Sequence, residues 1–392
     1  MLNIILLGLV SFFSDISSEM AYPLIPLYLT SAFGATPVLI GIIEGIAESL
    51  ASLLKVFSGH LTDKYNKKKS VAFVGYAAGL IYKIGLVLSA SWAGVLIGRI
   101  VDRVGKGIRT APRDVLVAES TEKGNLGKSF GIHKAMDMAG SAAGILMSFF
   151  LITHLGDGVH QYKEIFLFSG VFSIIGLIIL LFVKEKKQVH TIQSNRITFI
   201  KDLKKMDHNL KFYLLITLIF TLGNSSNSFI LLRAKNIGFK DNYVILLYFI
   251  YNITAAIFAI PFGKLSDKIG RKKVLILGYL SFSLVYAGFA FSNSKALLIA
   301  VFVLYGFYTA LITGAERAMI VEISPPELKG TFLGLHATIV GIALLPASII
   351  AGVLWHSFGP SAPFILGALL SFTAAILLLN IKKNRQNVKT EE

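Results

Sequence analysis

Residues 59–69 read GHLTDKYNKKK, and residues 263–273 read GKLSDKIGRKK. The two segments are 204 residues apart (263 − 59), and each lies between two long apolar stretches. Other residues recur at nearly the same spacing: Gly34 and Gly238, Arg113 and Arg317, Ser120 and Ser324, His133 and His336. A membrane chain built from two similar halves in the same orientation is typical of a transporter that rocks around a central site.

The composition indicates that lipid surrounds most of the chain. Its 392 residues are 54% hydrophobic and only 15% charged, whereas a soluble globular protein carries about 25% charged residues. The mean hydropathy is +0.69. Cysteine is absent, which excludes disulfides, thiolate nucleophiles and cysteine metal ligands.

The formal net charge of +16 has a topological explanation. Lys and Arg concentrate in residues 64–69, 184–211, 264–273 and 382–389, while the intervening loops carry few or none. This asymmetry places both termini and the two repeated loops in the cytoplasm, with the chain crossing the inner (plasma) membrane many times. We therefore expect a lipid bilayer and a small-molecule substrate as partners, and no nucleic acid.

Twelve stretches approach the roughly 20 apolar residues that a membrane crossing needs. They are residues 3–31, 37–58, 70–89, 92–117, 129–154, 164–183, 212–234, 242–262, 274–291, 296–320, 332–355 and 362–381. We therefore expect an all-α membrane protein with twelve transmembrane helices in two pseudo-symmetric six-helix bundles, at residues 1–183 and 212–381. A cytoplasmic linker (184–211) joins the bundles, and a cytoplasmic tail (382–392) follows the second. Within the linker, residues 199–205 fit either an interfacial helix or a solvated basic segment.

The repeated loops resemble motif A of the major facilitator superfamily, Gly-x-x-x-Asp-Arg/Lys-x-Gly-Arg/Lys-Arg/Lys. The second copy fits closely, and the first departs at Asn66, a residue that also tolerates the left-handed backbone of a tight turn. On the fourth span, Arg103, Gly107 and Ala111 fall at the spacing of the superfamily's motif B. The resemblance covers the whole chain.

The resemblance implies the fold of that superfamily, with spans 1, 4, 7 and 10 lining a cavity. It also implies that Asp63 and Asp267 cap neighbouring helix ends, where a carboxylate is favoured, and that cytoplasmic ion pairs latch the outward-facing state. The implied gating residues are Gly59, Asp63, Lys64, Lys67, Gly263, Asp267, Lys268 and Arg271. The alternative is that each loop is merely a basic, tight topological turn.

Ionisable residues within the spans gather in the first half, where they are costly unless they face water or each other. Spans one and two carry Asp15, Glu19, Glu44 and Glu48. At about 100° per residue, the cations of span four fall within a single arc of roughly 120°. They are Arg99, Arg103, Lys106, Arg109 and Arg113, with Asp102 inside the same stripe. Acidic helices are therefore expected to face a basic one.

Three interpretations of these charges remain open. In the first, the charged residues form structural ion pairs. In the second, one or two carboxylates carry protons, because burial favours the protonated carboxyl and a nearby arginine favours the charged one. In the third, guanidinium groups grip an anionic group of the substrate through two donors. The proton-coupling candidates are Asp15, Glu19, Glu44, Glu48 and Asp137. The substrate-binding candidates in this half are Arg99, Asp102 and Arg103.

The second half offers neutral polar groups at corresponding positions. Asn224 and Asn227 bound a polar break in span seven that aligns with Asp15 to Glu19 of span one. Further candidates for substrate binding are Arg233, Tyr248, Tyr251 and Asn252, the last three near the positions of the span-two glutamates. Polar groups of this kind also simply bond to neighbouring helices. The repeated His133 and His336 are interpreted as interfacial hydrogen-bonding groups rather than proton shuttles, and no metal site is expected.

These observations together predict a secondary transporter rather than an enzyme. No cofactor is expected: Gly105-Lys106-Gly107 is not a phosphate-binding loop, so an ion gradient, of protons, supplies the free energy. Efflux of a small, polar, charged solute by antiport is favoured. The alternatives are proton-coupled uptake of an organic anion or siderophore-like metal chelate, and an uncoupled facilitator. A monomer is expected.

Overall fold

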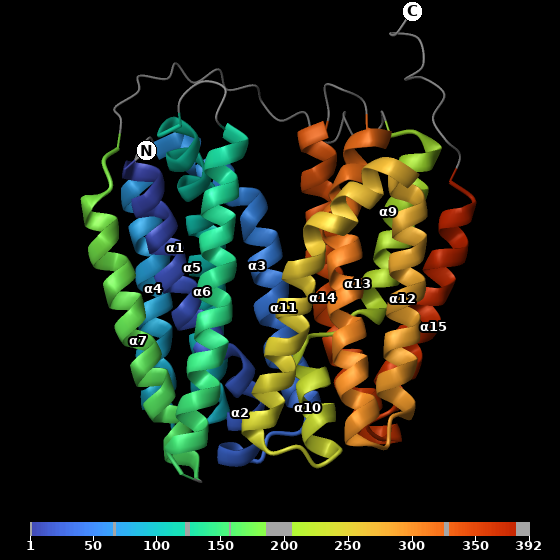
Figure 1. Cartoon of the computed structure of the whole chain (residues 1–392), viewed down its shortest axis with the longest axis horizontal. Helices are drawn as coiled ribbons and strands as arrows, with labels where there is room; N and C mark the ends of the chain where they lie inside the picture. The colour runs from blue at the N-terminus through green and yellow to red at the C-terminus, as the bar shows by residue number, and fades with distance from the viewer. Residues whose placement is uncertain are drawn as a thin grey trace, which may run out of the picture.

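The computed structural model describes residues 2–65, 68–121, 126–156, 158–185, 206–324 and 329–381. The first half contains α1 (Leu2–Ala21), η1 (Tyr22–Leu24), α2 (Ile25–Phe33), α3 (Pro37–Tyr65), α4 (Lys68–Leu88), α5 (Trp92–Glu119), α6 (Leu126–His154) and α7 (Val159–Phe182). The second contains α9 (His208–Gly223), α10 (Ser228–Asn236), α11 (Asp241–Ile269), α12 (Arg271–Phe291), α13 (Lys295–Ile323), α14 (Lys329–Phe358) and α15 (Ala362–Leu379). Figure 1 shows the two groups of helices side by side.

The helices are the twelve expected membrane spans, and the described residues contain no strand. Eleven segments are long and apolar enough to cross a membrane; α1 with α2 forms one of them, and α9 with α10 another. The twelfth span is α5, whose many charged residues keep its hydropathy below that of the others. The predicted all-α, twelve-helix architecture is therefore confirmed.

The first span of each half is interrupted in the middle. In the first half, η1 separates α1 from α2, and Pro23 and Pro26 lie at the starts of η1 and α2, because proline ends the helix before it and tolerates the first turn of the next. In the second half, residues 224–227 separate α9 from α10. Discontinuous helices at corresponding positions expose backbone and polar groups near the membrane centre, where transporters form their sites.

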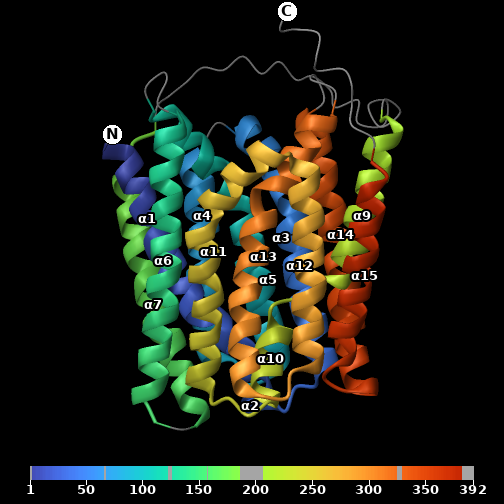
Figure 2. The same ribbon diagram turned by 45° about the vertical axis from the view of Figure 1, so that its right-hand side comes forward.

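Helix packing repeats from one half to the other. In the first half α1 packs on α6 and α7, and α4 on α5; in the second, α9 packs on α14 and α15, and α12 on α13. The halves meet along two further corresponding pairs, α3 with α14 and α6 with α11. As Figures 1 and 2 show, α1 begins and α15 ends at the same end of the molecule. This is called the terminal end, and the opposite one the far end.

The second repeated loop forms a tight turn between α11 and α12. Gly270 has φ 89° there, a left-handed conformation that glycine adopts without strain. In the first copy, Asn66 and Lys67 lie outside the described residues, as do the proposed interfacial segment 199–205 and the tail 382–392. Helix α9 starts at His208, inside the predicted linker, because the Asp207 side chain caps it by accepting from the Leu210 N–H at 2.8 Å.

Candidate functional site

A cavity of about 350 Å³ lies between the two halves at the level of the helix breaks. The first half lines it mainly with charged groups, and the second with amides and phenols. Its walls are formed by Ser18, Glu19, Tyr22, Glu48, Tyr82, Lys83, Arg99, Asp102, Arg103, Lys106, Asn224, Ser225, Ser226, Asn227, Tyr248, Tyr251, Tyr305, Tyr308, Thr309, Ile312 and Leu344. The site is therefore polar and asymmetric.

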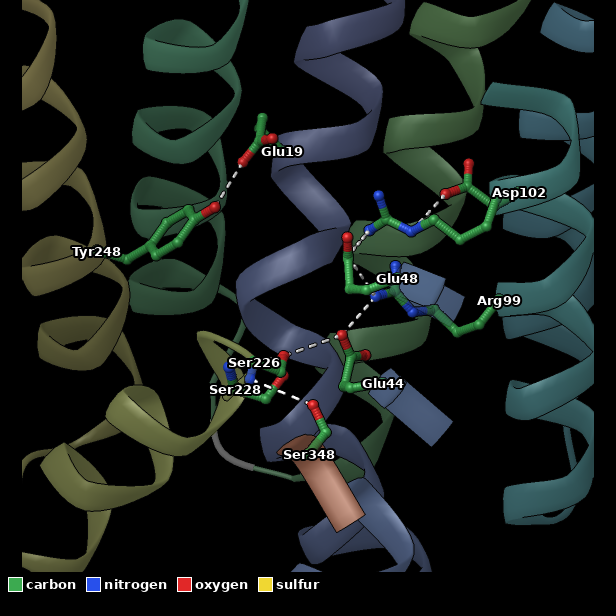
Figure 3. A network of polar contacts seen from close by, with 10 residues as sticks. Glu19, Glu44, Glu48, Arg99, Asp102, Ser226, Ser228, Tyr248 and Ser348 are labelled. Atoms are coloured by element: carbon green, nitrogen blue, oxygen red, sulfur yellow. Dashed lines mark hydrogen bonds and ion pairs between the residues drawn. The ribbon is translucent and has the colours of Figure 1, made fainter. Parts of the chain in front are cut away.

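A ladder of ion pairs joins α3 to α5 beside the cavity (Figure 3). Arg99 Nη2 donates to Glu44 Oε2 at 2.6 Å, and Arg103 Nη2 lies 3.1 Å from Glu48 Oε1. Glu44 and Arg99 are almost completely buried, with 0% and 1% of their side chains exposed. Paired burial avoids the several kcal/mol that an isolated charge costs. The acidic face of α3 thus meets the basic stripe of α5, as expected from the sequence.

The break in the second half reaches this ladder through serine. Ser226 Oγ donates to Glu44 Oε2 at 3.4 Å, and the Ser226 N–H donates to Ser348 Oγ of α14 at 3.4 Å (Figure 3). Residues 224–227 have left the helical hydrogen-bond ladder, which frees backbone groups for such contacts. The unwound segment therefore ties a carboxylate of one half to two elements of the other.

An amide at the break organises the phenols of the second half. Asn227 Nδ2 donates to Tyr251 Oη at 3.2 Å, and Tyr305 Oη donates to Asn227 Oδ1 at 2.8 Å. The Tyr251 and Tyr305 ring centres are 5.0 Å apart. Asn227 thus holds an aromatic wall that faces the charged one.

Glu19 joins the two walls directly. Tyr248 Oη donates to Glu19 Oε2 at 3.1 Å, a contact from α11 to α1 (Figure 3). Glu19 is half-buried and lines the cavity. A carboxylate in this position can exchange a proton with the cavity, and any change in its charge acts on a bond between the halves.

Asp15 and Asp137 belong to a second polar cluster, inside the first half and outside the cavity lining. Asp15 lies within electrostatic range of Asp137 and Lys106. His133 Nδ1 is 3.6 Å from Asp137 Oδ1, and His133 Nε2 is 3.0 Å from Ser11 Oγ. This arrangement gives His133 the interhelical hydrogen bond expected from its repeat position.

Two predicted binding residues lie away from the cavity lining. The Arg233 guanidinium donates to the backbone carbonyls of Phe289, Ala290 and Ser292 at 2.9–3.2 Å, near the far end. Asn252 Nδ2 donates to the Tyr248 carbonyl of its own helix at 2.8 Å. The Arg233 guanidinium thus binds backbone carbonyls at the C-terminal end of α12 rather than a ligand. We assign structural roles to both Arg233 and Asn252.

The repeated loops are only partly described. The surroundings of Gly59, the side chains of Asp63, Lys64 and Asp267, and the whole of Lys67 lie outside the described part. Gly263 and Lys268 are exposed on α11. Arg271 Nη1 donates to Glu322 Oε2 at 2.7 Å, within the second half. The gating role of these residues stays a prediction.

Several cavity residues were not among the sequence candidates. They are Ser18, Tyr22, Tyr82, Lys83, Lys106, Ser225, Ser226, Tyr305, Tyr308, Thr309, Ile312 and Leu344. Lys83 had a signal, because it is the cation of an otherwise apolar span. The tyrosines had none, since aromatic residues within spans usually pack against neighbouring helices or lipid.

Hydrogen bonds between the halves lie at the level of the cavity and at the far end. Four hydrogen bonds among the described residues cross from one half to the other. Two join the break and Glu19 to the opposite half, as described above. The other two are at the far end, where Tyr162 donates to Asp241, and Asn242 Nδ2 donates to Thr153 Oγ1 at 3.4 Å. Side-chain contacts therefore join the two halves at the level of the cavity and at the far end.

Comparison with known proteins places these features in a family. The sequence model described as Major Facilitator Superfamily matches residues 7–224 and 213–392. The uncharacterized MFS-type transporter MJ1317 of Methanocaldococcus jannaschii is 42% identical over 385 residues, covering 97% of this chain and 94% of that protein. Tetracycline resistance protein, class B, of Escherichia coli is 29% identical over 195 residues, covering 47% and 48%. The crystal structure of the nucleoside transporter NupG matches with TM-score 0.78, 13% identity and coverage of 97% and 99%, a likeness of fold alone.

Proposed function

The chain belongs to the major facilitator superfamily of membrane transporters, and we propose that it moves a small, polar, charged solute by proton-coupled alternating access. The observation that carries this proposal is the cavity between the halves, in which Glu19 and Glu48 share the walls with cationic side chains. A membrane-embedded cavity lined by ionisable groups is the expected site of a polar solute and its coupling ion. We further propose an inner-membrane location with the terminal end in the cytoplasm, which the distribution of Lys and Arg supports.

Alternating access requires the far end to open while the terminal end closes. The two halves would then tilt along the α3–α14 and α6–α11 seams, and the Tyr162–Asp241 and Thr153–Asn242 contacts would break. The Glu19–Tyr248 bond also crosses the cavity. Its strength depends on the charge of Glu19, because a carboxylate accepts more strongly than a neutral acid. Proton binding at Glu19 would therefore weaken one tie between the halves.

Export by proton antiport is the direction we favour. The tetracycline resistance protein, similar over about half of each chain, supports it. The second candidate is proton-coupled uptake of an organic anion or metal chelate, which the four cations of the cavity support. Without proton linkage, the same fold would act as a facilitator.

Vesicles of defined orientation test direction and coupling. With an acidic lumen, inside-out vesicles that contain an antiporter accumulate solute while the lumen loses protons. A symporter instead accumulates solute in right-side-out vesicles when the external medium is acidic, because solute and proton then move inwards together. The probes are tetracycline and a panel of radiolabelled organic anions. If a solute exchanges across the membrane but neither orientation responds to the imposed gradient, the protein is a facilitator and the coupling proposal is wrong.

The variant Glu19→Gln should abolish proton-driven accumulation while leaving solute exchange between equal pools intact. The glutamine side chain has the same size as glutamate and still offers an oxygen that accepts from Tyr248, but it does not bind or release a proton in this pH range. Glu164→Gln, an acidic residue of α7 outside the cavity lining, is the matched control. Proton-driven transport that persists in Glu19→Gln, and equally in Glu48→Gln, Asp15→Asn and Glu44→Gln, would contradict proton coupling through these carboxylates.

A further inference from the structure

The α4 wall of the cavity holds a buried cation without a protein counter-charge in contact. Lys83 is 1% exposed and lines the cavity, and its Nζ lies 4.4 Å from the centre of the Tyr82 ring. No hydrogen bond or ion pair connects its ammonium to another residue in the described ranges. Its neighbour Tyr82 is 2% exposed, and the Tyr82 hydroxyl also has no hydrogen-bond partner there. Two adjacent buried donors thus point into one cavity without an acceptor.

Donors also outnumber acceptors on the α5 wall. The Nε of Arg99 and that of Arg103 lack a hydrogen-bond acceptor among the described atoms, although their terminal nitrogens pair with Glu44 and Glu48. Lys106 also lines the cavity, and its ammonium makes neither an ion pair nor a hydrogen bond within the described part of the chain. The two arginines therefore pair directly with α3. The two lysines have carboxylates only beyond ion-pair distance, Asp102 near Lys83, and Asp15 and Glu19 near Lys106.

The carboxylates of the cavity are already engaged. Glu48 pairs with Arg103, Asp102 Oδ2 lies 3.8 Å from Arg103 Nε, and Glu19 accepts from Tyr248. Unpaired buried donors and charges are costly, and an arriving group with several acceptor oxygens removes that cost. An anion fits this requirement; a cation or a neutral apolar group does not.

The opposite wall sets the shape of the rest of the ligand. Tyr248, Tyr251, Tyr305 and Tyr308 present uncharged aromatic surface to the cavity, with the Tyr305 and Tyr308 rings stacked at 5.5 Å. Such surface favours a planar or apolar body over a second charge. The ligand would thus have an anionic end and an uncharged, ring-like end.

We infer that the site binds an organic anion, whose carboxylate, phosphate or sulfonate group is held by Lys83 and Lys106 with Tyr82 as a hydroxyl donor. The uncharged body of the anion lies against the tyrosine wall. That this ligand is the transported solute rests on the proposed function. The assignment moves anion recognition from Arg99 and Arg103, the sequence candidates, to two lysines of the same wall.

Binding to purified protein tests the assignment. The probes are benzoate and phenyl phosphate, with uncharged benzamide as a matched comparison, followed by thermal stabilisation and calorimetry at constant ionic strength. An anion should stabilise the wild type, and Lys83→Gln should weaken its binding roughly tenfold or more. Lys295→Gln is the control, because this exposed lysine likewise lies over an aromatic ring, Phe239, at 5.5 Å.

Each outcome is decisive. Unchanged anion binding in Lys83→Gln, benzamide binding as strong as benzoate binding, or the absence of stabilisation by both anions would overturn the assignment. If Lys83→Gln does not yield folded protein, Tyr82→Phe removes a single oxygen and should weaken anion binding several-fold. Anion binding without proton-driven flux would refute the proposed coupling and leave the anion site intact, so the two failures are distinguishable.

Discussion

Glu44 and Arg99 form the most deeply buried ion pair beside the cavity. Taking two charges out of water is expensive, and their attraction repays that cost only with good geometry. The 2.6 Å contact supplies that geometry, and Ser226 adds a second donor to the same Glu44 oxygen. Removing one partner leaves the other as an uncompensated buried charge.

Glu44→Ala should therefore lower the free energy of unfolding by about 3–5 kcal/mol. The double variant Glu44→Gln, Arg99→Gln should be less destabilised than the sum of its single variants, because no isolated charge remains. Unfolding in detergent, followed by tryptophan fluorescence, measures both. The half-exposed pair of Arg271 and Glu322 is the control, since its loss should cost about 1 kcal/mol or less. Additive effects of Glu44 and Arg99 would contradict the coupling.

The sequence predicted that the site is polar and charged, but it predicted less well which residues line it. The helical period places Arg99 and Arg103 on one face of α5, and Glu44 and Glu48 on one face of α3. It does not say which neighbour a face meets. Glu44 is consequently buried behind the cavity, and Arg233 binds backbone carbonyls, while Lys83 enters the lining from a span that reads as apolar. Which side chains contact each other depends on how the helices pack, and the residues around a single position do not reveal that.

At the scale of elements, glycines shape the seam between α3 and α14. A Cβ added to Gly41 would lie 2.2 Å from the Ser348 carbonyl oxygen, and one on Gly352 would lie 2.5 Å from that of Pro37. These positions bring the two backbones together without side chains between them. Close backbone approach of this kind is typical of helix pairs within membranes.

Gly41→Ala should push α3 away from α14 and destabilise the protein by roughly 1–3 kcal/mol, the usual cost of overpacking. Gly85→Ala is the matched control, because no other group lies within 4 Å of an added Cβ in α4. The control should be neutral or gain about 0.5–1 kcal/mol, since alanine favours a helix over glycine. Thermal unfolding of both variants checks this. A Gly41→Ala variant as stable as Gly85→Ala would mean that the seam has room to relax.

Most helices could be predicted from the sequence, because a long apolar segment between polar loops can cross a membrane only as a helix. The helices run past the apolar spans: α3 ends at Tyr65 and α11 at Ile269, beyond residues 58 and 262. These extensions are rich in polar residues, so hydropathy gives no signal for them. The sequence indicated the break at residues 224–227 through its polar run, and the break at η1 follows Pro23 and Pro26.

At the scale of the whole molecule, side-chain contacts at the far end join the two halves. Asp241 is central there: it accepts from Tyr162 of the other half and pairs with Lys235 of its own. The terminal end has no hydrogen bond between the halves in the part of the chain that the structure describes. An equilibrium between two arrangements is biased by whatever bonds only one of them.

Asp241→Asn should shift that equilibrium towards opening at the far end. Because the chain contains no cysteine, cysteines introduced at Thr153 and Asn242 report the distance by cross-linking without background. The ratio of cross-linked to uncross-linked protein should fall roughly fivefold, as expected for the loss of about 1 kcal/mol of stabilisation. Glu164→Gln, in α7 at the same end, should leave the yield unchanged. An equal yield in both backgrounds would show that Asp241 does not hold the far end closed.

The pairing of two glutamates with two arginines in the ladder has an electrical consequence. Displacing one elementary charge through a 100 mV potential involves about 2.3 kcal/mol. Glu44, Glu48, Arg99 and Arg103 sum to zero and lie on α3 and α5 of the same half, so their joint movement contributes almost no gating current. Any voltage dependence of reorientation then arises from other charges, such as Lys83 and Lys106 and the charge of the cargo, and not from these four residues.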